Sequence, residues 1–285
     1  MLQPIIDTHV HIWDLKRASY PWLQHDTSVL ARSYTLDELE PERKKTNVVA
    51  GILVQAAGNT EDTELMLEAA RATGWIKGIV GWLPLMNPRA TQKLLEEKYT
   101  KEKYFKGVRH QVHDEENIRW LLQPAVIESL QIIAAHNLPY DIVGILPGHI
   151  DIAIKLAEQV PALRMVFDHL NQPPVASKEK FGQWGTLLKT AAENKNFYAK
   201  ISGLGTASGI GKSWGAIDLL PYIEYVLMQF GTDRCFCGGD WPVSLLAGSY
   251  SKTWQVYEEV LSALLSEKEK QKVLYDSAAR FYTLE

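Results

Sequence analysis

Short apolar runs recur along the chain, and most are followed by a segment whose apolar residues are spaced three to four positions apart. Eight runs rich in β-branched residues predict strands at residues 4–8, 48–55, 76–83, 105–111, 138–143, 163–168, 197–202 and 234–240. The helical spacing predicts helices at residues 60–72, 90–103, 125–135, 149–158, 181–193, 219–230, 253–264 and 267–281. Strands that alternate with helices form a parallel sheet. The pattern therefore predicts an α/β protein built as a (β/α)8 TIM barrel.

Length and composition agree with one such barrel. The chain has 285 residues, and a (β/α)8 barrel typically takes about 250. No stretch rich in proline, glycine or serine divides the chain, so residues 1–285 are expected to form a single domain. Hydrophobic residues make up 46% and charged residues 22%, as in a soluble globular enzyme. The glycine-rich residues 203–213 lack phosphate-loop spacing, because Thr206 stands where glycine is needed, and predict a loop at the barrel mouth.

Charge and sequence signals narrow the classes of partner. The net charge is −4 and no block of lysine and arginine occurs, which argues against nucleic acid. No segment approaches the roughly 18 apolar residues of a membrane span, and residues 1–4 open no signal peptide. We therefore expect a cytoplasmic protein that acts on a small molecule, with a homo-oligomer left open. The only cysteines, Cys235 and Cys237, are expected to be buried and reduced, because they lie two apart on one strand.

Chemically reactive side chains gather where the predicted strands end. In an extended strand alternate residues share a face, so His9 and His11 can bind one ion or one water. Asp240 meets them if the first and last strands are neighbours, as in a parallel barrel. The polar and aromatic residues at or beyond the strand ends are His9, His11, Gln55, Trp82, Arg109, His110, Asp141, His149, Asp168, His169, Lys200 and Asp240. Five of the eight histidines are in this set, which favours a site at that end of the barrel.

Two chemical schemes fit these side chains. Imidazoles with a carboxylate suit a borderline divalent ion such as zinc, which lowers the pKa of a bound water or polarises a carbonyl group. The same groups can work without metal, with Asp240 as general base and the histidines donating hydrogen bonds to a developing oxyanion. The spacing of the residues does not choose between the schemes.

Arg109 and four tryptophans are candidates for substrate binding. Arg109 at a strand end can bind a carboxylate or a lactone oxygen, and its structural alternative is an ion pair with Asp114 or Glu115. The tryptophans near the predicted mouth suit stacking on a sugar ring, and packing of the barrel is the alternative for each of them. They are Trp13, Trp22, Trp82 and Trp241.

Seven segments, in this order and spacing, resemble the amidohydrolase superfamily of the amidohydrolase 2 type. The segments are Ile6-Asp7-Thr8-His9-Val10-His11-Ile12-Trp13-Asp14, Gly78-Ile79-Val80-Gly81-Trp82, Lys106-Gly107-Val108-Arg109-His110, Leu138-Pro139-Tyr140-Asp141, Phe167-Asp168-His169, Lys200-Ile201-Ser202-Gly203-Leu204 and Gly238-Gly239-Asp240-Trp241-Pro242-Val243. Within that superfamily the chain looks like the sugar-lactonase branch, which holds L-fuconolactonase and L-rhamnonolactonase relatives. Two segments depart from the branch: Leu170-Asn171-Gln172-Pro173 stands where Gly-Lys-Pro is frequent, and Gly239 stands where serine is usual.

The resemblance implies a (β/α)8 barrel that hydrolyses a ring ester, with Asp240 handling the water. It implies a divalent metal, most plausibly zinc, that turnover does not necessarily require. The expected catalytic residues are Asp240, His169 and His110, and the expected metal ligands are His9, His11, His169 and Asp240. The expected substrate-binding residues are Arg109, Trp13, Gln55, Trp82, His149 and Trp241.

The leading hypothesis is a lactonase that acts on a five- or six-membered aldonolactone. A base, an oxyanion stabiliser and an orienting group suffice for that reaction, because a lactone carbonyl is already an activated ester. The alternative is a metal-dependent decarboxylase of an aromatic or unsaturated acid, which needs a carboxylate clamp that only Arg109 can supply. A catalytically silent binding protein fits poorly, because the charged groups at the strand ends are intact.

Overall fold

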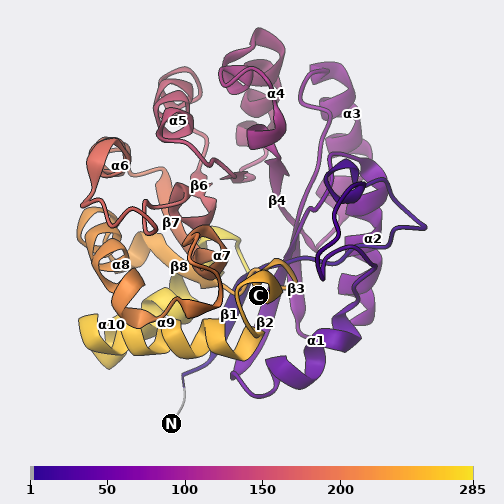
Figure 1. Ribbon diagram of the computed structural model, residues 1–285. Coiled ribbons are helices and arrows are strands. Elements are labelled where there is room, and N and C mark those ends of the chain that lie inside the picture. The colour runs from indigo at the N-terminus through magenta and orange to yellow at the C-terminus, as the bar shows by residue number, and fades with distance from the viewer. Residues whose placement is uncertain (1–2, 285) are drawn as a thin grey trace.

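Eight parallel strands form the barrel, and the computed structural model describes residues 3–284 (Figure 1). The strands pair in chain order. They are β1 (Ile5–Val10), β2 (Val48–Val54), β3 (Ile76–Gly81), β4 (Phe105–His110), β5 (Tyr140–Ile142), β6 (Met165–Phe167), β7 (Phe197–Ser202) and β8 (Cys235–Gly238). Seven lie within a predicted strand, β1 extends two residues beyond its predicted end, and helices separate the strands, so the predicted (β/α)8 barrel is confirmed. The expectation for the start of the chain, at Met1 and Leu2, lies outside the described residues.

Backbone hydrogen bonds beyond the end of β8 bring the first and last strands together. The Asp240 N–H donates to the His9 carbonyl over 2.7 Å, and the His11 N–H donates to the Trp241 carbonyl over 2.7 Å. The register of β1 against β2 also shifts between Asp7 and Val10. Such irregularities are frequent beside active sites because they re-aim side chains. The segment that carries the two histidines is therefore hydrogen-bonded directly to the segment that carries Asp240.

Helices cover the outside of the strands (Figure 1). The helices are α1 (Leu36–Arg43), α2 (Thr60–Ala72), α3 (Pro88–Glu97), α4 (Pro124–Ala135), α5 (Pro147–Gln159), α6 (Gly182–Ala192), α7 (Leu204–Ala207), α8 (Ala216–Phe230), α9 (Tyr250–Leu264), α10 (Glu267–Gln271) and α11 (Ser277–Phe281). Helix α1 was not predicted, because its sequence buries only Leu36 and Leu39 and shows no apolar stripe. The predicted helix 267–281 is interrupted by a π turn at Lys272–Asp276.

The floor of the barrel is closed by the end of the chain. Phe281 and Tyr282 are buried in one apolar cluster with inward residues such as Ile6, Val166 and Phe236. Above this cluster the interior is polar, because Asp141, Asp168 and Lys200 are fully buried there. The barrel therefore carries its ionisable groups between an apolar floor and the open carboxyl ends of the strands.

Two sequence expectations about chemistry outside the site can be compared with the structure. Cys235 and Cys237 are buried free thiols, as predicted, and burial raises the pKa of Cys235 to about 12. Among residues 3–284, no helix is both long enough and apolar enough to cross a membrane.

Candidate active site

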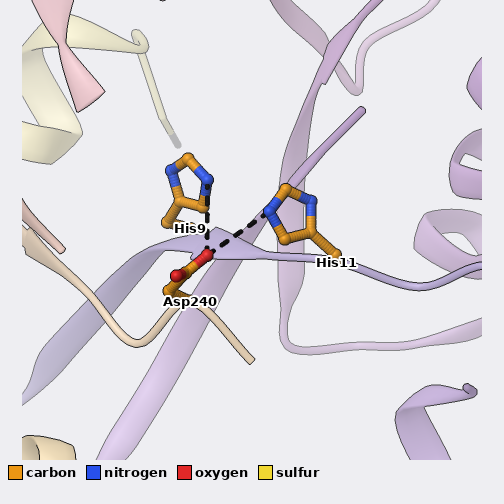
Figure 2. Close-up of side chains that lie close together, drawn as sticks. All are labelled: His9, His11 and Asp240. Atoms are coloured by element: carbon orange, nitrogen blue, oxygen red, sulfur yellow. Dashed lines mark ion pairs between the residues drawn. The ribbon is translucent and has the colours of Figure 1, made fainter. Parts of the chain in front are cut away.

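His9, His11 and Asp240 form a compact group at the carboxyl ends of β1 and β8, which we call the cavity cluster (Figure 2). The Asp240 Oδ1 atom lies 3.5 Å from His11 Nε2 and 3.8 Å from His9 Nε2. All three residues are buried, and each offers one ligand atom within 4.8 Å of the others. The φ angle of Asp240 is 57°, in the left-handed region that non-glycine residues seldom adopt. The backbone at Asp240 is therefore held by its surroundings in an uncommon conformation.

The tautomer of His11 follows from its hydrogen bond. Its Nδ1 atom lies 2.7 Å from the Val54 carbonyl oxygen, which can only accept, so Nδ1 carries the ring proton. In the neutral ring, Nε2 therefore presents a lone pair to the Asp240 carboxylate. Two electron pairs that face each other over 3.5 Å require a proton or a cation between them. The donor set of the cavity cluster thus fits a divalent ion of the zinc type.

His9 lies beneath the cavity between charged side chains. Burial lowers its pKa well below the usual range, so the ring is neutral at pH 7. The Nδ1 atom lies 3.5 Å from Asp168 Oδ1 and 3.3 Å from Lys200 Nζ, and Nε2 lies 3.3 Å from Arg109 Nη1. A carboxylate on one ring nitrogen of a metal-binding histidine fixes the orientation of the ring. The other nitrogen, Nε2, faces both Arg109 and Asp240.

Arg109, Asp141, Asp168 and Lys200 form a second group, the buried ion network, deeper in the barrel. Lys200 Nζ lies 2.5 Å from Asp141 Oδ2 and 2.8 Å from Asp168 Oδ1, and Arg109 Nη1 lies 3.1 Å from Asp168 Oδ2. The hydroxyl of Tyr282 donates to Asp141 over 2.8 Å. Two cations therefore face two carboxylates, and the charges balance.

The pKa values of the two network carboxyls differ because their partners differ. Burial opposes ionisation of Asp168, but the charges of Lys200 and Arg109 and the contact with His9 hold its pKa well below the usual range. Burial raises the pKa of Asp141 to about 6, although Lys200 opposes that rise. A carboxyl with two cationic neighbours stays ionised more readily than a carboxyl with one.

A further buried carboxylate, Asp62 on α2, holds the loop after β2 with uncharged donors. It accepts the Tyr20 hydroxyl over 2.9 Å, the Ala56 N–H over 2.9 Å and the Ala57 N–H over 3.4 Å. Burial raises its pKa to about 6, and these hydrogen bonds only partly oppose the rise. Ala56 lines the cavity described next, so Asp62 shapes one wall of it.

A cavity of about 440 Å³ opens above the cavity cluster. The polar residues that line it are His11, Arg109, Gln111, His113, His169, Gln172, Thr206 and Asp240. Its larger apolar lining residues are Trp13, Trp22, Val143, Ile145 and Val243. Gly203 also lines it with a φ of 59°, and a Cβ atom there would lie 2.5 Å from His169 Nδ1 and 2.7 Å from Asp240 Oδ2. At Gly203 the backbone therefore approaches His169 and Asp240 so closely that only glycine fits without displacing them.

The structure brings five of the expected site residues to this cavity: His11, Trp13, Arg109, His169 and Asp240. His169 is not in the ligand group found among residues 3–284, and its Nδ1 atom shares a hydrogen bond of 2.9 Å with the Ser202 hydroxyl. Burial lowers the pKa of His169, so the ring is neutral at pH 7. Its role as a metal ligand stays a prediction.

Five other expected site residues, Gln55, Trp82, His110, His149 and Trp241, are not among the residues that line the cavity. The indole N–H of Trp82 donates to His110 over 3.1 Å, and His110 stacks on Trp120 and bonds Glu115 over 2.7 Å. Nδ1 of His149 accepts the backbone N–H of Leu146 over 3.1 Å at the start of α5. Trp241 packs edge-on against Tyr34, and the Gln55 carbonyl accepts a hydrogen bond from Arg109. The side chains of Trp82, His110, His149 and Trp241 thus contact other parts of the protein, while the buried side-chain oxygen of Gln55 has no hydrogen-bond partner among the described residues.

Arg109 makes a different ion pair from the one that the sequence offered as its structural role. The alternative of an ion pair with Asp114 or Glu115 is wrong, because Asp114 pairs with His113, Glu115 pairs with His110 and Arg109 pairs with Asp168. The Nη2 atom of Arg109 donates to the Gln55 carbonyl over 2.6 Å. Both ends of the guanidinium fork are therefore engaged by the protein.

Four polar residues of the cavity were missed as site residues: Gln111, His113, Gln172 and Thr206. The first three stand within four residues of Arg109 or His169. Their position just past a strand end is the signal that could have identified them, because the loops after barrel strands build the site in this fold. Thr206 lies in the glycine-rich segment that was predicted to form a mouth loop.

The fold and the site together define the class of protein. A parallel barrel that holds a histidine at the end of its first strand, a second histidine just past it and an aspartate from the loop after its last strand, below a cavity, has the layout of a barrel enzyme. Residues 6–284 match the amidohydrolase family, and the chain belongs to that family.

Two proteins named L-fucono-1,5-lactonase are similar to this chain over nearly its whole length. The protein from Burkholderia multivorans is 31% identical over 287 residues, which covers 98% of this chain and 96% of the relative. The protein from Burkholderia ambifaria is 28% identical over 283 residues, with coverage of 98% and 96%. A crystal structure of an amidohydrolase from Burkholderia multivorans with bound zinc has a TM-score of 0.88 and 30% identity, and covers 99% of this chain and 100% of that chain. The resemblance seen in the sequence to the amidohydrolase sugar-lactonase branch is thus confirmed.

Proposed function

We propose that the protein is a lactonase that opens the ring ester of a sugar lactone, with Asp240 activating the attacking water. The observation that carries the proposal is the position of Asp240, whose Oδ1 atom faces His11 Nε2 over 3.5 Å on the floor of a small cavity. The similarity to two L-fucono-1,5-lactonases supports a ring ester as the substrate class.

In this proposal Asp240 accepts a proton from water as the water oxygen attacks the lactone carbonyl carbon. The carbonyl electron pair moves to oxygen. Arg109 lines the cavity, and because its fork is engaged by Asp168 and the Gln55 carbonyl it stabilises that oxyanion through its charge and not as a two-pronged clamp. The bond from the carbonyl carbon to the ring oxygen then breaks, and the proton on Asp240 passes to that oxygen. The product is an open-chain hydroxy acid. General base catalysis of this kind contributes about 10²–10⁴-fold to a rate.

The neutral ring of His169 extends the polar floor beside Asp240. Burial lowers the pKa of His169, so the ring is uncharged at pH 7 and has one nitrogen that donates a hydrogen bond and one that accepts. Its contact with the Ser202 hydroxyl orients the ring. We assign His169 to orienting the substrate carbonyl or the water.

A divalent ion fits the cavity cluster, and His9, His11 and Asp240 would hold it. Such an ion supplies a lowered pKa of water or a polarised carbonyl group when it is bound. The similar amidohydrolase with bound zinc supports this assignment.

The cavity favours a neutral polyol ring over an acid. Trp13 and Trp22 give it flat apolar walls, and Gln111, Gln172 and Thr206 offer groups that bond hydroxyls. The decarboxylase alternative needs a free carboxylate clamp, but the fork of Arg109 is engaged by Asp168 and by the Gln55 carbonyl. A lactone therefore suits the site better than an aromatic or unsaturated acid.

The test is a panel of 1,4- and 1,5-aldonolactones assayed by proton release on ring opening. Dipeptides and simple amides serve as alternative substrates, and carbon dioxide release from aromatic acids tests the decarboxylase hypothesis. We expect hydrolysis of at least one sugar lactone and no turnover of amides. Preference for a dipeptide over every lactone, or carbon dioxide release without lactone opening, would overturn the proposal.

A further inference from the structure

Asp7 is a buried carboxylate that the proposed reaction does not use. Its Oδ1 atom accepts the Gly239 N–H over 2.7 Å and the His9 N–H over 3.0 Å. Its Oδ2 atom accepts the hydroxyl of Tyr250, the first residue of α9, over 2.6 Å. Both Asp7 and Tyr250 have zero exposure to solvent. One side chain on β1 thus ties the residue before Asp240 to the backbone of His9 and to an outer helix.

The backbone conformation of Asp240 explains why the hydrogen bond from the Gly239 N–H to Asp7 matters. Asp240 has a φ of 57°, a conformation that costs free energy and persists only where the surrounding structure enforces it. Three backbone bonds of 2.7 Å hold the turn: Asp240 N–H to the His9 carbonyl, His11 N–H to the Trp241 carbonyl and Ser244 N–H to the Asp240 carbonyl. A side chain adds a further bond at this turn, because Asp7 accepts the Gly239 N–H over 2.7 Å.

Gly239 is matched to this arrangement by the space around it. A Cβ atom at residue 239 would lie 2.5 Å from Tyr250 Cε2 and 2.6 Å from Asp7 Oδ2. Contacts that short force atoms apart, so even alanine would separate the Tyr250 hydroxyl from the Asp7 carboxylate. Glycine at residue 239 is therefore needed for Tyr250 and Asp7 to pack as they do.

We propose that Asp7 and Tyr250 are positioning residues that fix the carboxylate of Asp240 toward His9 and His11. Tyr250 holds Asp7, Asp7 holds the Gly239 N–H, and the turn then aims Asp240 into the cavity. This inference deepens the proposed function and rests on it for its kinetic consequence. Its structural consequence, the order of the Gly239–Asp240 turn, is independent of the substrate.

Tyr250→Phe removes only the hydroxyl, and Tyr257→Phe is the matched control. Tyr257 lies on the same helix, is equally buried, and its hydroxyl accepts the Leu204 N–H over 3.2 Å. We expect Tyr250→Phe to lower kcat on the best lactone at least about fivefold with KM within twofold, because a small misplacement of a reacting group is costly. The control should keep kcat within about twofold.

Gly239→Ala is the second variant, and Gly74→Ala is its control, because a Cβ atom at residue 74 meets nothing within 4 Å. We expect kcat to fall in Gly239→Ala with KM retained, and to stay unchanged in Gly74→Ala. If Tyr250→Phe loses thermal stability but the folded fraction keeps wild-type kcat, the role is structural and the inference is overturned.

Amide hydrogen exchange gives a readout that needs no substrate. In Tyr250→Phe the peptide covering Gly239 and Asp240 should exchange at least about tenfold faster than in wild type, and in Tyr257→Phe it should not. Faster exchange in a protein that opens no lactone would leave the positioning role standing and reject the proposed function. Unchanged exchange in Tyr250→Phe would overturn the positioning role.

Discussion

The buried ion network lies beneath the cavity cluster in the same barrel, yet the electrostatics of the two groups are opposite. In the network, two cations face two carboxylates, and Lys200 Nζ is within 2.8 Å of an oxygen on each. In the cavity cluster, His11 Nε2 faces the Asp240 carboxylate over 3.5 Å, and among the described residues no lysine or arginine pairs with Asp240. Each carboxylate of the network pairs with a lysine or an arginine, whereas the carboxylate of the cluster pairs only with histidines.

That difference teaches how to separate structural charges from reactive ones. Charged groups that pair with opposite charges of the protein stabilise the barrel and hold their neighbours in place. Acidic and basic groups that lack such a pair can bind a proton, an ion or a substrate. His9 touches both groups, through Asp168 on one ring nitrogen and near Asp240 on the other. The network therefore supports the cluster from below.

The largest effect we predict comes from breaking the network. Lys200→Met leaves Asp141 and Asp168 with one cation fewer in a fully buried place. Removal of one partner of a buried ion pair costs about 3–5 kcal/mol. Urea unfolding should show that loss in the free energy of unfolding.

Lys270→Met is the control for that measurement. Lys270 pairs with Glu258 and Glu267, which are 43% and 75% exposed and return to water when the lysine is lost. That variant should lose no more than about 1 kcal/mol. The double variant Lys200→Met, Asp141→Asn should recover part of the loss, and equal losses in Lys200→Met and Lys270→Met would contradict the assignment.

The next prediction compares Asp62, whose carboxyl accepts hydrogen bonds from uncharged donors, with Asp168, whose carboxyl pairs with cations. The pKa of Asp62 is raised to about 6 in the folded protein, so the folded state holds this proton more tightly than the unfolded state. Its contribution to stability is therefore full below the unfolded pKa and is lost as pH rises through about 6. Relative to wild type, Asp62→Asn should gain up to about 1.4 kcal/mol per pH unit between roughly pH 4 and 6.

Unfolding free energies of both proteins from pH 4 to 8 check this prediction. The difference between them should level off above about pH 6. Asp168 behaves in the opposite way, because its lowered pKa keeps its contribution until the pH falls well below the usual range of an aspartate. A pH-independent difference between wild type and Asp62→Asn would contradict the role given to burial.

A smaller effect should come from filling the cavity cluster with zinc. At a free concentration of 100 times Kd, a bound ion stabilises the folded state by about 2.7 kcal/mol. Thermal unfolding and metal analysis should show zinc binding to wild type, and its loss in the double variant His9→Ala, His11→Ala. The double variant His25→Ala, His136→Ala removes two exposed histidines and should bind as wild type does. Equal zinc content in the two double variants would reject the site.

The sequence predicted the strands well because their β-branched runs are buried on both faces. Residues 60–72 were predicted as a helix, and α2 has those bounds. Helix α1 was missed because only two of its residues are buried. The sequence thus predicted the elements whose apolar pattern is strong.

The site was predictable only as far as strand ends determine it. His11, Arg109 and Asp240 lie at or just past strand ends and reach the cavity, but Trp82 and His110 also lie at or just past strand ends and bond each other instead. Position past a strand end does not fix the direction of a side chain. Tyr250 and Tyr282 come from the last helices, and no local pattern connects them with Asp7 or Asp141.

The central claim is that Asp240 activates water for lactone opening, and Asp240→Asn tests it most directly. The substitution keeps the size of the side chain and removes the base. With a lactone found in the panel, kcat/KM should fall by at least about 10²-fold while the free energy of unfolding stays close to that of wild type. A stable Asp240→Asn protein that opens the lactone at nearly the wild-type rate would contradict the account.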